Sequence, residues 1–363
     1  MSSEEDVDVE AAVFQKAEAL GMVSAFERLR YLRRQQGNPP AKLEVRPTLP
    51  GFPYFVDGSR FYAVLIGIDE YASFPLQGCV SDVRLMEQYL TDLGVPRNRI
   101  QLLLGSKEHT SPGDPMYPSR AHIIDTLLGI IDNPEIIHGD NVVIFYAGHG
   151  SRYTLEGKCG AKKYVEALCP IDRDTVGDDD KPVPDISDRE FNTILKQISQ
   201  VKGDCITVIL DCCYSGGLTR NPLGAGERTF SPTKHATLQD MLIAGDKKLS
   251  GPPGYRSISS KDWYSDMSSH VVMAACKDNQ FATSKMVEGE SGMERYNGIF
   301  TESLVRELQS ERCTRETTYV DLVHSLDRTH HQTRVVAGEH CNLFGRRESQ
   351  LSLYRPGIFS VFL

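Results

Sequence analysis

The chain has 363 residues, 40% of them hydrophobic and 25% charged, which is ordinary for a globular protein with one large α/β domain or two smaller ones. Its net charge of -9 argues against a nucleic-acid-binding protein, which would normally carry a basic field. The nine cysteines are odd in number and too few for a disulfide scaffold, so we expect a reducing, cytoplasmic compartment. Apolar runs stay short of the roughly 18 residues of a membrane span, so we expect no membrane partner.

Residues 1–55 are predicted to form an appendage to the main domain. The segment starts acidic, has helical spacing of apolar residues over 11–34, and carries prolines from 39 to 53 that mark a linker. Two interpretations stay open: a helix packed on the main domain, or a prosegment or partner arm. The main domain is then expected over 56–363.

The main domain alternates between strand and helix patterns. Apolar, β-branched runs predict buried strands at 61–68, 99–104, 142–147, 206–210 and 271–276, and helical spacing predicts helices at 77–93, 119–132, 188–200, 298–310 and 317–329. Ser81 and Ser119 are the expected N-caps of the first two helices. Residues 218–262 are predicted to be a long loop, and the tail 351–363 is predicted to be an edge strand. This alternation predicts a mostly parallel sheet with helices on both faces.

Two of the predicted strands are followed by residue types that act together in nucleophilic catalysis, a histidine and a cysteine. Residues 141–151 read NVVIFYAGHGS and place His149 just beyond one strand, and residues 206–217 read ITVILDCCYSGG and place Cys213 just beyond another. Ligands of open α/β sheets bind outside the carboxyl ends of the strands. A cysteine nucleophile needs a base that is near in space, because its thiol is only slightly ionised at neutral pH. We therefore predict a dyad of Cys213 and His149.

Each of these residues alone has a simpler interpretation. A single cysteine after a buried strand is usually a small core hydrophobe, and a single histidine in a glycine turn is usually structural. Their shared position at two strand ends favours a site. In that site the backbone amides of Gly150 and Cys213 are the natural donors to the negative charge that develops on a substrate carbonyl oxygen.

These motifs, with YAVLIGIDEY at 62–71 and LQGCVSD at 76–82, resemble those of caspase-type cysteine peptidases, and most of all the type I metacaspases and their fungal-type relatives. The resemblance extends over 61–363 and implies a caspase-like α/β fold with a mostly parallel central sheet. It implies that His149 is the catalytic histidine and that Cys213, rather than Cys212, is the nucleophile of the D-x-C-x-S-G motif. It further implies that Asp82 and Asp211 line the S1 pocket, which binds the P1 residue before the cleaved bond.

Electrostatics agrees with a preference for Arg or Lys at P1. Burying a carboxylate costs free energy unless a positive charge lies beside it. Two acids that face an empty pocket are therefore expected to bind a guanidinium or an ammonium group. Arginine gains more, because its planar fork can bind both oxygens. We expect peptide or protein substrates with a basic P1 residue. Basic residues of the 218–262 loop, among them Arg220, Arg228 and Arg256, are either self-cleavage points or plain surface charges.

The resemblance also implies a calcium site, in which Glu166 and Asp188 match two of the usual ligands. Arg189 stands where a further acid is usual, and another acid is missing near Arg220. Calcium prefers about six to eight oxygen ligands, so calcium activation stays open.

Two further departures keep a second class of function open. Tyr214 stands where metacaspases usually have a histidine, and Ala147 replaces a usual serine. The chain is therefore predicted to be a cysteine endopeptidase, with a catalytically weak caspase-like interaction module as the alternative. Caspases proper pair through an edge strand, whereas metacaspases do not, so the resemblance implies a monomer.

Overall fold

The computed structural model describes the main part of the chain in eleven segments. These are residues 57–109, 111–156, 162–177, 180–212, 228–233, 235–252, 254–275, 284–288, 294–313, 317–326 and 335–338. The predicted appendage 1–55, the predicted tail strand 351–363 and the predicted nucleophile Cys213 lie outside the described residues.

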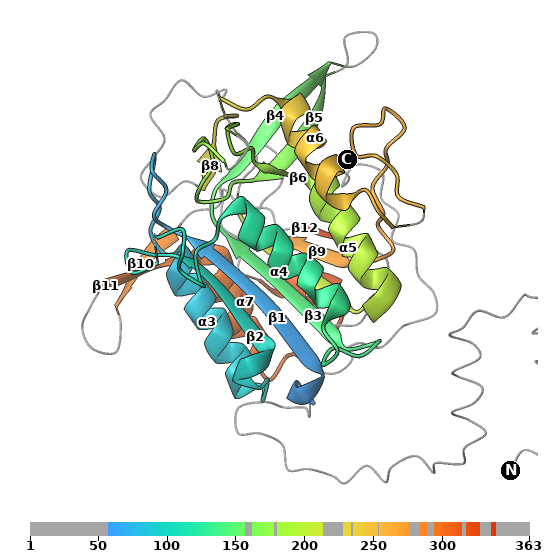
Figure 1. The fold of residues 1–363 in the computed structure, drawn as a ribbon. Helices are drawn as coiled ribbons and strands as arrows, with labels where there is room; N and C mark the ends of the chain where they lie inside the picture. Colours follow the sequence, from blue (N-terminus) through green and yellow to red (C-terminus); the bar gives the residue numbers. More distant parts are fainter. Residues whose placement is uncertain are drawn as a thin grey trace, which may run out of the picture. The chain divides into compact units, whose positions relative to one another are not determined.

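A six-stranded sheet forms the centre, in the order β12-β9-β7-β3-β1-β2 (Figure 1). Five of its strands run parallel and β12 is antiparallel to β9. Four of the parallel strands are almost wholly buried, as their continuous apolar runs predict, whereas the edge strand β2 is buried only over its second half. The strands are β1 (Phe61–Ile68), β2 (Ile100–Gly105), β3 (Asn141–Ala147), β7 (Ile206–Asp211), β9 (Val271–Ala274) and β12 (Val335–Gly338).

Helices cover both faces of this sheet. The chain steps from β1 to β2 through α3 and then reverses across β1 to reach β3 through α4, so right-handed crossovers place α3 and α4 on opposite faces. Helix α7 packs on α3, and α5 packs on α4 and α6. The predicted fold class is confirmed. The helices are α3 (Cys79–Asp92), α4 (Arg120–Asp132), α5 (Asp188–Lys202), α6 (Leu238–Leu249), α7 (Ile299–Leu308) and α8 (Tyr319–Ser325), with short turns η1 (Gly58–Arg60) and η2 (Arg97–Arg99).

Smaller sheets extend beyond the carboxyl ends of the central strands. One has the order β6-β5-β4-β8, in which β4 pairs with β5 antiparallel and with β8 parallel. The other is the hairpin of β10 and β11. These strands are short or alternate with charged residues, so they lack the apolar runs that predicted the central strands. They are β4 (Gly150–Glu156), β5 (Lys162–Leu168), β6 (Ile186–Ser187), β8 (Thr229–Phe230), β10 (Ser284–Glu288) and β11 (Glu294–Gly298).

The structure corrects two local predictions and confirms a third. The predicted 218–262 loop contains β8 and helix α6, which begins with a capping box between Thr237 and Asp240. Ser81 is not the N-cap of α3, because that helix begins after Gly78, and the Ser81 hydroxyl binds Asn297 instead. Ser119 does cap α4, by accepting from the His122 amide. Within the described residues, every helix is too short or too polar to cross a membrane.

Candidate active site

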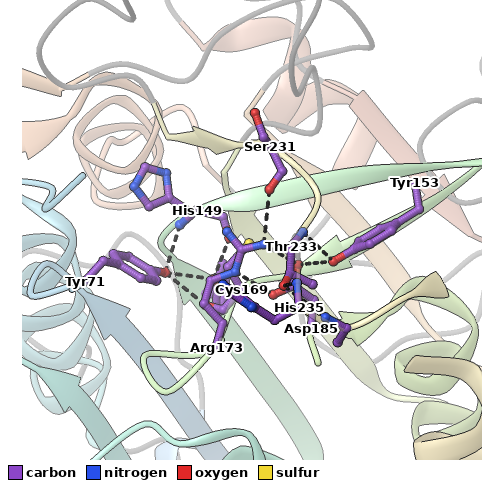
Figure 2. Close-up of polar contacts among 11 residues, drawn as sticks. Tyr71, His149, Tyr153, Cys169, Arg173, Asp185, Ser231, Thr233 and His235 are labelled. Carbon is purple, nitrogen blue, oxygen red and sulfur yellow. Dashed lines mark hydrogen bonds and ion pairs between the residues drawn. The ribbon is translucent and has the colours of Figure 1, made fainter. Parts of the chain in front are cut away.

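His149 is held at the end of β3 through its backbone. Its N–H donates to the Tyr71 hydroxyl (2.9 Å), and its carbonyl accepts from the Tyr146 hydroxyl (2.7 Å). Figure 2 shows Tyr71 beside His149, with ring centroids 4.6 Å apart. Gly148 allows this close approach, because a Cβ there would lie 2.6 Å from the Tyr71 hydroxyl. The histidine is therefore fixed and buried by two tyrosines that the sequence analysis did not single out.

The imidazole ring is oriented by a backbone carbonyl. His149 Nε2 lies 2.8 Å from the Phe74 carbonyl oxygen, which can only accept a hydrogen bond. The proton of the neutral ring therefore sits on Nε2, and Nδ1 carries the lone pair that a general base uses. Phe74 adopts a left-handed backbone conformation (φ 57°) to present this carbonyl. No sequence signal marks Phe74 for this position.

The sheet register aligns the strand ends that precede the two predicted catalytic residues in the sequence. Ala147 of β3 pairs directly with Asp211 of β7, and His149 and Cys213 each follow two residues later. The strands β2 and β3 lie on opposite sides of β1, so the strand order reverses between β1 and β3, and open α/β sheets bind ligands at such switch points. His149 is thus described at this edge, while Cys213 lies outside the described residues and its role stays a prediction.

Asp82 and Asp211 come together as one buried acid pair, which we call the acid socket. Asp82 lies in the first turn of α3, and Asp211 ends β7. The Gly298 amide donates to Asp82 (2.7 Å), and the Thr301 hydroxyl donates to Asp211 (2.7 Å). Only glycine fits at 298, because a Cβ there would lie 2.2 Å from an Asp211 oxygen. Their use as an S1 pocket remains a prediction, but their convergence is a property of the fold.

The guanidinium of Arg228 fills the acid socket. It lies 2.6 Å from an Asp82 oxygen and 3.0 Å from an Asp211 oxygen, and it also donates to the Asp211 carbonyl (3.1 Å). All three residues are 0% exposed. Burial raises the pKa of Asp82 to about 7, and the charge of Arg228 opposes that shift. Sequence reasoning considered Arg228 only as a possible cleavage point and did not connect it with these acids.

The segment that follows Arg228 is held on the edge of the smaller sheet. The Gly150 amide donates to the Arg228 carbonyl (3.2 Å), which starts the pairing of β8 with β4. Two residues beyond β8 are anchored as well (Figure 2): Arg173 donates to the Ser231 carbonyl, and the Thr233 amide donates to Tyr153. Buried Asp185 binds both Arg173 and Tyr153.

The predicted calcium ligands do not fit a calcium ion. Glu166 binds Arg152 (2.7 Å), its direct cross-strand partner in β4. Asp188 begins α5 and accepts from the Arg189 amide, and burial raises its pKa to about 7. Among the described residues, no three His, Cys, Asp or Glu side chains converge as metal ligands would. One neutralised carboxylate and one easily protonated carboxylate fall well short of the about six to eight oxygens that calcium prefers.

The sheet order and the helices on both faces define an open α/β domain with a histidine at its switch point. Residues 62–222 match the family model for the metacaspase, peptidase C14 domain. The chain is 31% identical to Metacaspase-6 of Arabidopsis thaliana over 160 residues, which is 43% of this chain and 38% of that protein. It is 29% identical to Metacaspase-3 of Trypanosoma cruzi over 171 residues, which is 47% of this chain and 44% of that protein.

A solved structure supports the fold over a longer stretch. The crystal structure of a Geobacter sulfurreducens protein superposes with a TM-score of 0.50 at 17% identity, covering 79% of this chain and 97% of that one. Residues 62–222 are therefore similar to the metacaspase peptidase C14 domain, in agreement with the resemblance of the two strand-end motifs. The chain matches less than half the length of the curated relatives above.

Proposed function

We propose that this protein is a cysteine endopeptidase in which Cys213 is the nucleophile and His149 the general base. The observation that carries the proposal is the His149–Phe74 hydrogen bond, because it leaves Nδ1 as the proton acceptor. The imidazole takes the thiol proton, and the thiolate attacks the substrate carbonyl carbon. The imidazolium then returns the proton to the leaving amine. The Gly150 amide and that of Cys213 would stabilise the oxyanion.

The proposal includes a preference for Arg or Lys at P1. Support comes from the acid socket, in which two buried carboxylates hold a guanidinium at 2.6 and 3.0 Å. A substrate arginine presents the same group, and its fork can reach both carboxylates. Activation through calcium bound at Glu166 and Asp188 is not part of the proposal, since these residues do not fit the ion. We expect the enzyme to act as a monomer, which light scattering in solution can check.

A second candidate function is a caspase-like interaction module with little catalysis. The occupied acid socket favours it, because a permanently bound Arg228 would exclude a basic substrate side chain. The two candidates differ in one observable. An endopeptidase should react at Cys213 with a peptidyl electrophile that carries a basic P1 residue, whereas the module should not.

The deciding experiment compares two neighbouring cysteines in the full-length chain. Wild type, Cys213→Ala and Cys212→Ala are assayed with fluorogenic peptides that end in Arg, Lys or Asp, with and without calcium. Cys213→Ala should lose activity by at least about a thousandfold, as for other enzymes stripped of their nucleophile. Cys212→Ala, which changes a buried neighbour, should keep most of it. Equal activity in Cys213→Ala, or a preference for Asp, would reject the proposal.

A further inference from the structure

The residue that follows β1 caps the helix that carries one acid of the socket. The Asp69 side chain accepts hydrogen bonds from the backbone amides of Cys79 (2.9 Å) and Val80 (3.2 Å), the first two residues of α3. The first amides of a helix have no partner within the helix, and the helix dipole favours a negative charge beside them. Asp69 therefore takes the capping role that was predicted for Ser81.

The backbone of Asp69 closes the loop between β1 and α3. Its carbonyl accepts from the amides of Tyr71 (3.0 Å) and Leu76 (2.8 Å), so both ends of this loop are tied to one residue. The same loop supplies two contacts that hold His149, from the Tyr71 hydroxyl (2.9 Å) and from the Phe74 carbonyl (2.8 Å). The position of the histidine ring thus depends on a loop that begins and ends at Asp69.

Helix α3 carries a second part of the candidate site. Asp82 lies in its first turn and forms the acid socket with Asp211. The beginning of the helix lies directly against β1, because a Cβ at Gly67 would lie 2.6 Å from the Cys79 carbonyl oxygen. A shift of the first turn of α3 would therefore move one acid of the socket relative to the other, and Asp69 is the side chain that holds this turn.

We propose that Asp69 is a positioning residue that places His149 and Asp82 at the same time, the first through the loop and the second through α3. This inference rests on the proposed function, in which His149 is the general base and Asp82 binds a basic P1 side chain. Loss of the carboxylate releases the first amides of α3 and loosens the loop that presents the Phe74 carbonyl. A misplacement of about 1 Å in such a group can cost about a hundredfold in rate.

The alternative is that Asp69 is only a helix cap, whose loss lowers stability and leaves the site intact. Ser119 offers the matched control, since its hydroxyl caps α4 by accepting from the His122 amide (3.2 Å) on the opposite face of the sheet. Asp69→Ala and Ser119→Ala each remove a side-chain acceptor at a helix N-terminus. Asp69→Asn is the conservative variant, because asparagine keeps a carbonyl acceptor and caps helices about as well as aspartate.

The first readout is the hydrolysis of fluorogenic peptides that end in Arg or Lys by the full-length chain and these variants, under conditions where urea titration shows all of them folded. Asp69→Ala should lower kcat/KM about a hundredfold, with a lower kcat from His149 and a higher KM from Asp82. Asp69→Asn should stay within about fivefold of wild type, and Ser119→Ala within about twofold. Equal losses in the two alanine variants would overturn the inference.

The second readout needs no catalysis. Nuclear magnetic resonance of the chain labelled with ¹⁵N-histidine, with His149→Gln to assign the ring, should show the His149 proton on Nε2 and in slow exchange, because the Phe74 carbonyl accepts it. Asp69→Ala should lose this slow exchange, whereas Asp69→Asn and Ser119→Ala should keep it. Should Asp69→Ala fail to unfold cooperatively, Asp69→Ser decides, since its hydroxyl is one bond shorter than the carboxylate. A serine variant with unchanged kinetics and exchange then counts against the inference.

The remaining outcomes separate this inference from the proposed function. A wild type that hydrolyses basic peptides, beside an Asp69→Ala chain with unchanged kinetics and unchanged His149 exchange, overturns the inference alone. An asparagine variant as impaired as the alanine variant does the same, because capping would then not be what matters. A wild type that hydrolyses no peptide overturns the proposed function, and the resonance comparison then decides whether Asp69 positions His149.

Discussion

Two buried acidic sites in this domain were each expected to bind a cation from outside, and in each an arginine of the chain takes that place. In the acid socket, Arg228 lies between Asp82 and Asp211, far from them in sequence. In the smaller sheet, Arg152 lies opposite Glu166 as a cross-strand partner. The sequence motifs thus predicted where negative charge is buried but not what neutralises it.

The two arginines differ in how they are held. Arg152 belongs to the same hairpin as its acid, and its guanidinium also lies 5.1 Å from the Tyr164 ring. Arg228 belongs to a separate short strand and pairs with acids from a helix and a central strand. A local pair forms whenever its hairpin forms, whereas a long-range pair depends on the docking of its segment. Arg152 is therefore part of the scaffold, and Arg228 behaves as a bound ligand.

The largest expected effect is the loss of Arg228 itself. In a Cys213→Ala background, which keeps the chain intact, Arg228→Gln leaves two buried carboxylates without a counterion. Breaking a buried pair in this way costs about 3–5 kcal/mol of unfolding free energy. Urea titration of the two chains measures the difference. A cost below about 1 kcal/mol would show that the socket does not depend on Arg228.

The second effect is a pH dependence that extends to higher pH in that variant than in the parent Cys213→Ala chain. Arg228 lowers the pKa of Asp82, which burial raises to about 7, so its removal should raise that pKa further. A carboxyl whose pKa is higher in the folded than in the unfolded state stabilises the fold at low pH and loses that contribution as pH rises through the folded value. The parent chain should level off above pH 7, whereas Arg228→Gln should keep losing up to about 1.4 kcal/mol per pH unit there.

Urea titrations of the parent and the variant at pH 6, 7 and 8 measure this difference. The double variant Arg228→Gln/Asp82→Asn is the control, because it has no carboxyl at position 82 and should show a flatter dependence. A slope that is the same in both variants would contradict the assignment to Asp82.

A smaller effect is expected at the local pair. Arg152→Gln leaves the buried Glu166 carboxylate without its ion pair, but the guanidinium is 11% exposed and the partners share a hairpin, so we expect a cost of about 1–3 kcal/mol. The same urea titration in the Cys213→Ala background compares it directly with Arg228→Gln. If Arg152→Gln costs as much as Arg228→Gln, the distinction between scaffold and ligand is lost.

The smallest expected effect is that of calcium. Because Arg152 already neutralises Glu166, millimolar calcium should shift the melting temperature of the Cys213→Ala chain by no more than the same concentration of magnesium. Differential scanning fluorimetry makes this comparison. A stabilisation specific to calcium that disappears in Asp188→Asn would restore the predicted calcium site.

Much of the scaffold was predictable because it depends on local pattern. Four of the five parallel strands are continuous apolar runs, and short runs of this kind are typical of buried parallel strands. Helix α6 was missed because Gly245 and a polar first turn interrupt its apolar spacing, while its capping box, Thr237 to Asp240, was a signal that was available. The hairpin strands β4 and β5 were missed because charged residues fill them.

The site was predictable only where a sequence motif marks it. His149 and Asp211 belong to motifs at strand ends and Asp82 to the motif that begins α3, and the fold places the histidine at the switch point and joins the two acids. Phe74 acts through its carbonyl, which any residue could supply, so its identity carries no signal. Arg228 meets its partners across 146 and 17 residues, a pairing that only the folded chain defines.

The position of β8 determines what self-cleavage of the bond after Arg228, an alternative that the sequence leaves open, would leave behind. Strand β7 precedes that bond and β9 follows it, yet the two pair along their length in one sheet. Helix α7, which also follows the bond, packs against α3. The two pieces would therefore remain one folded body with a shared core. A denaturing gel would show two bands, while a sizing column would show a single particle of the original mass.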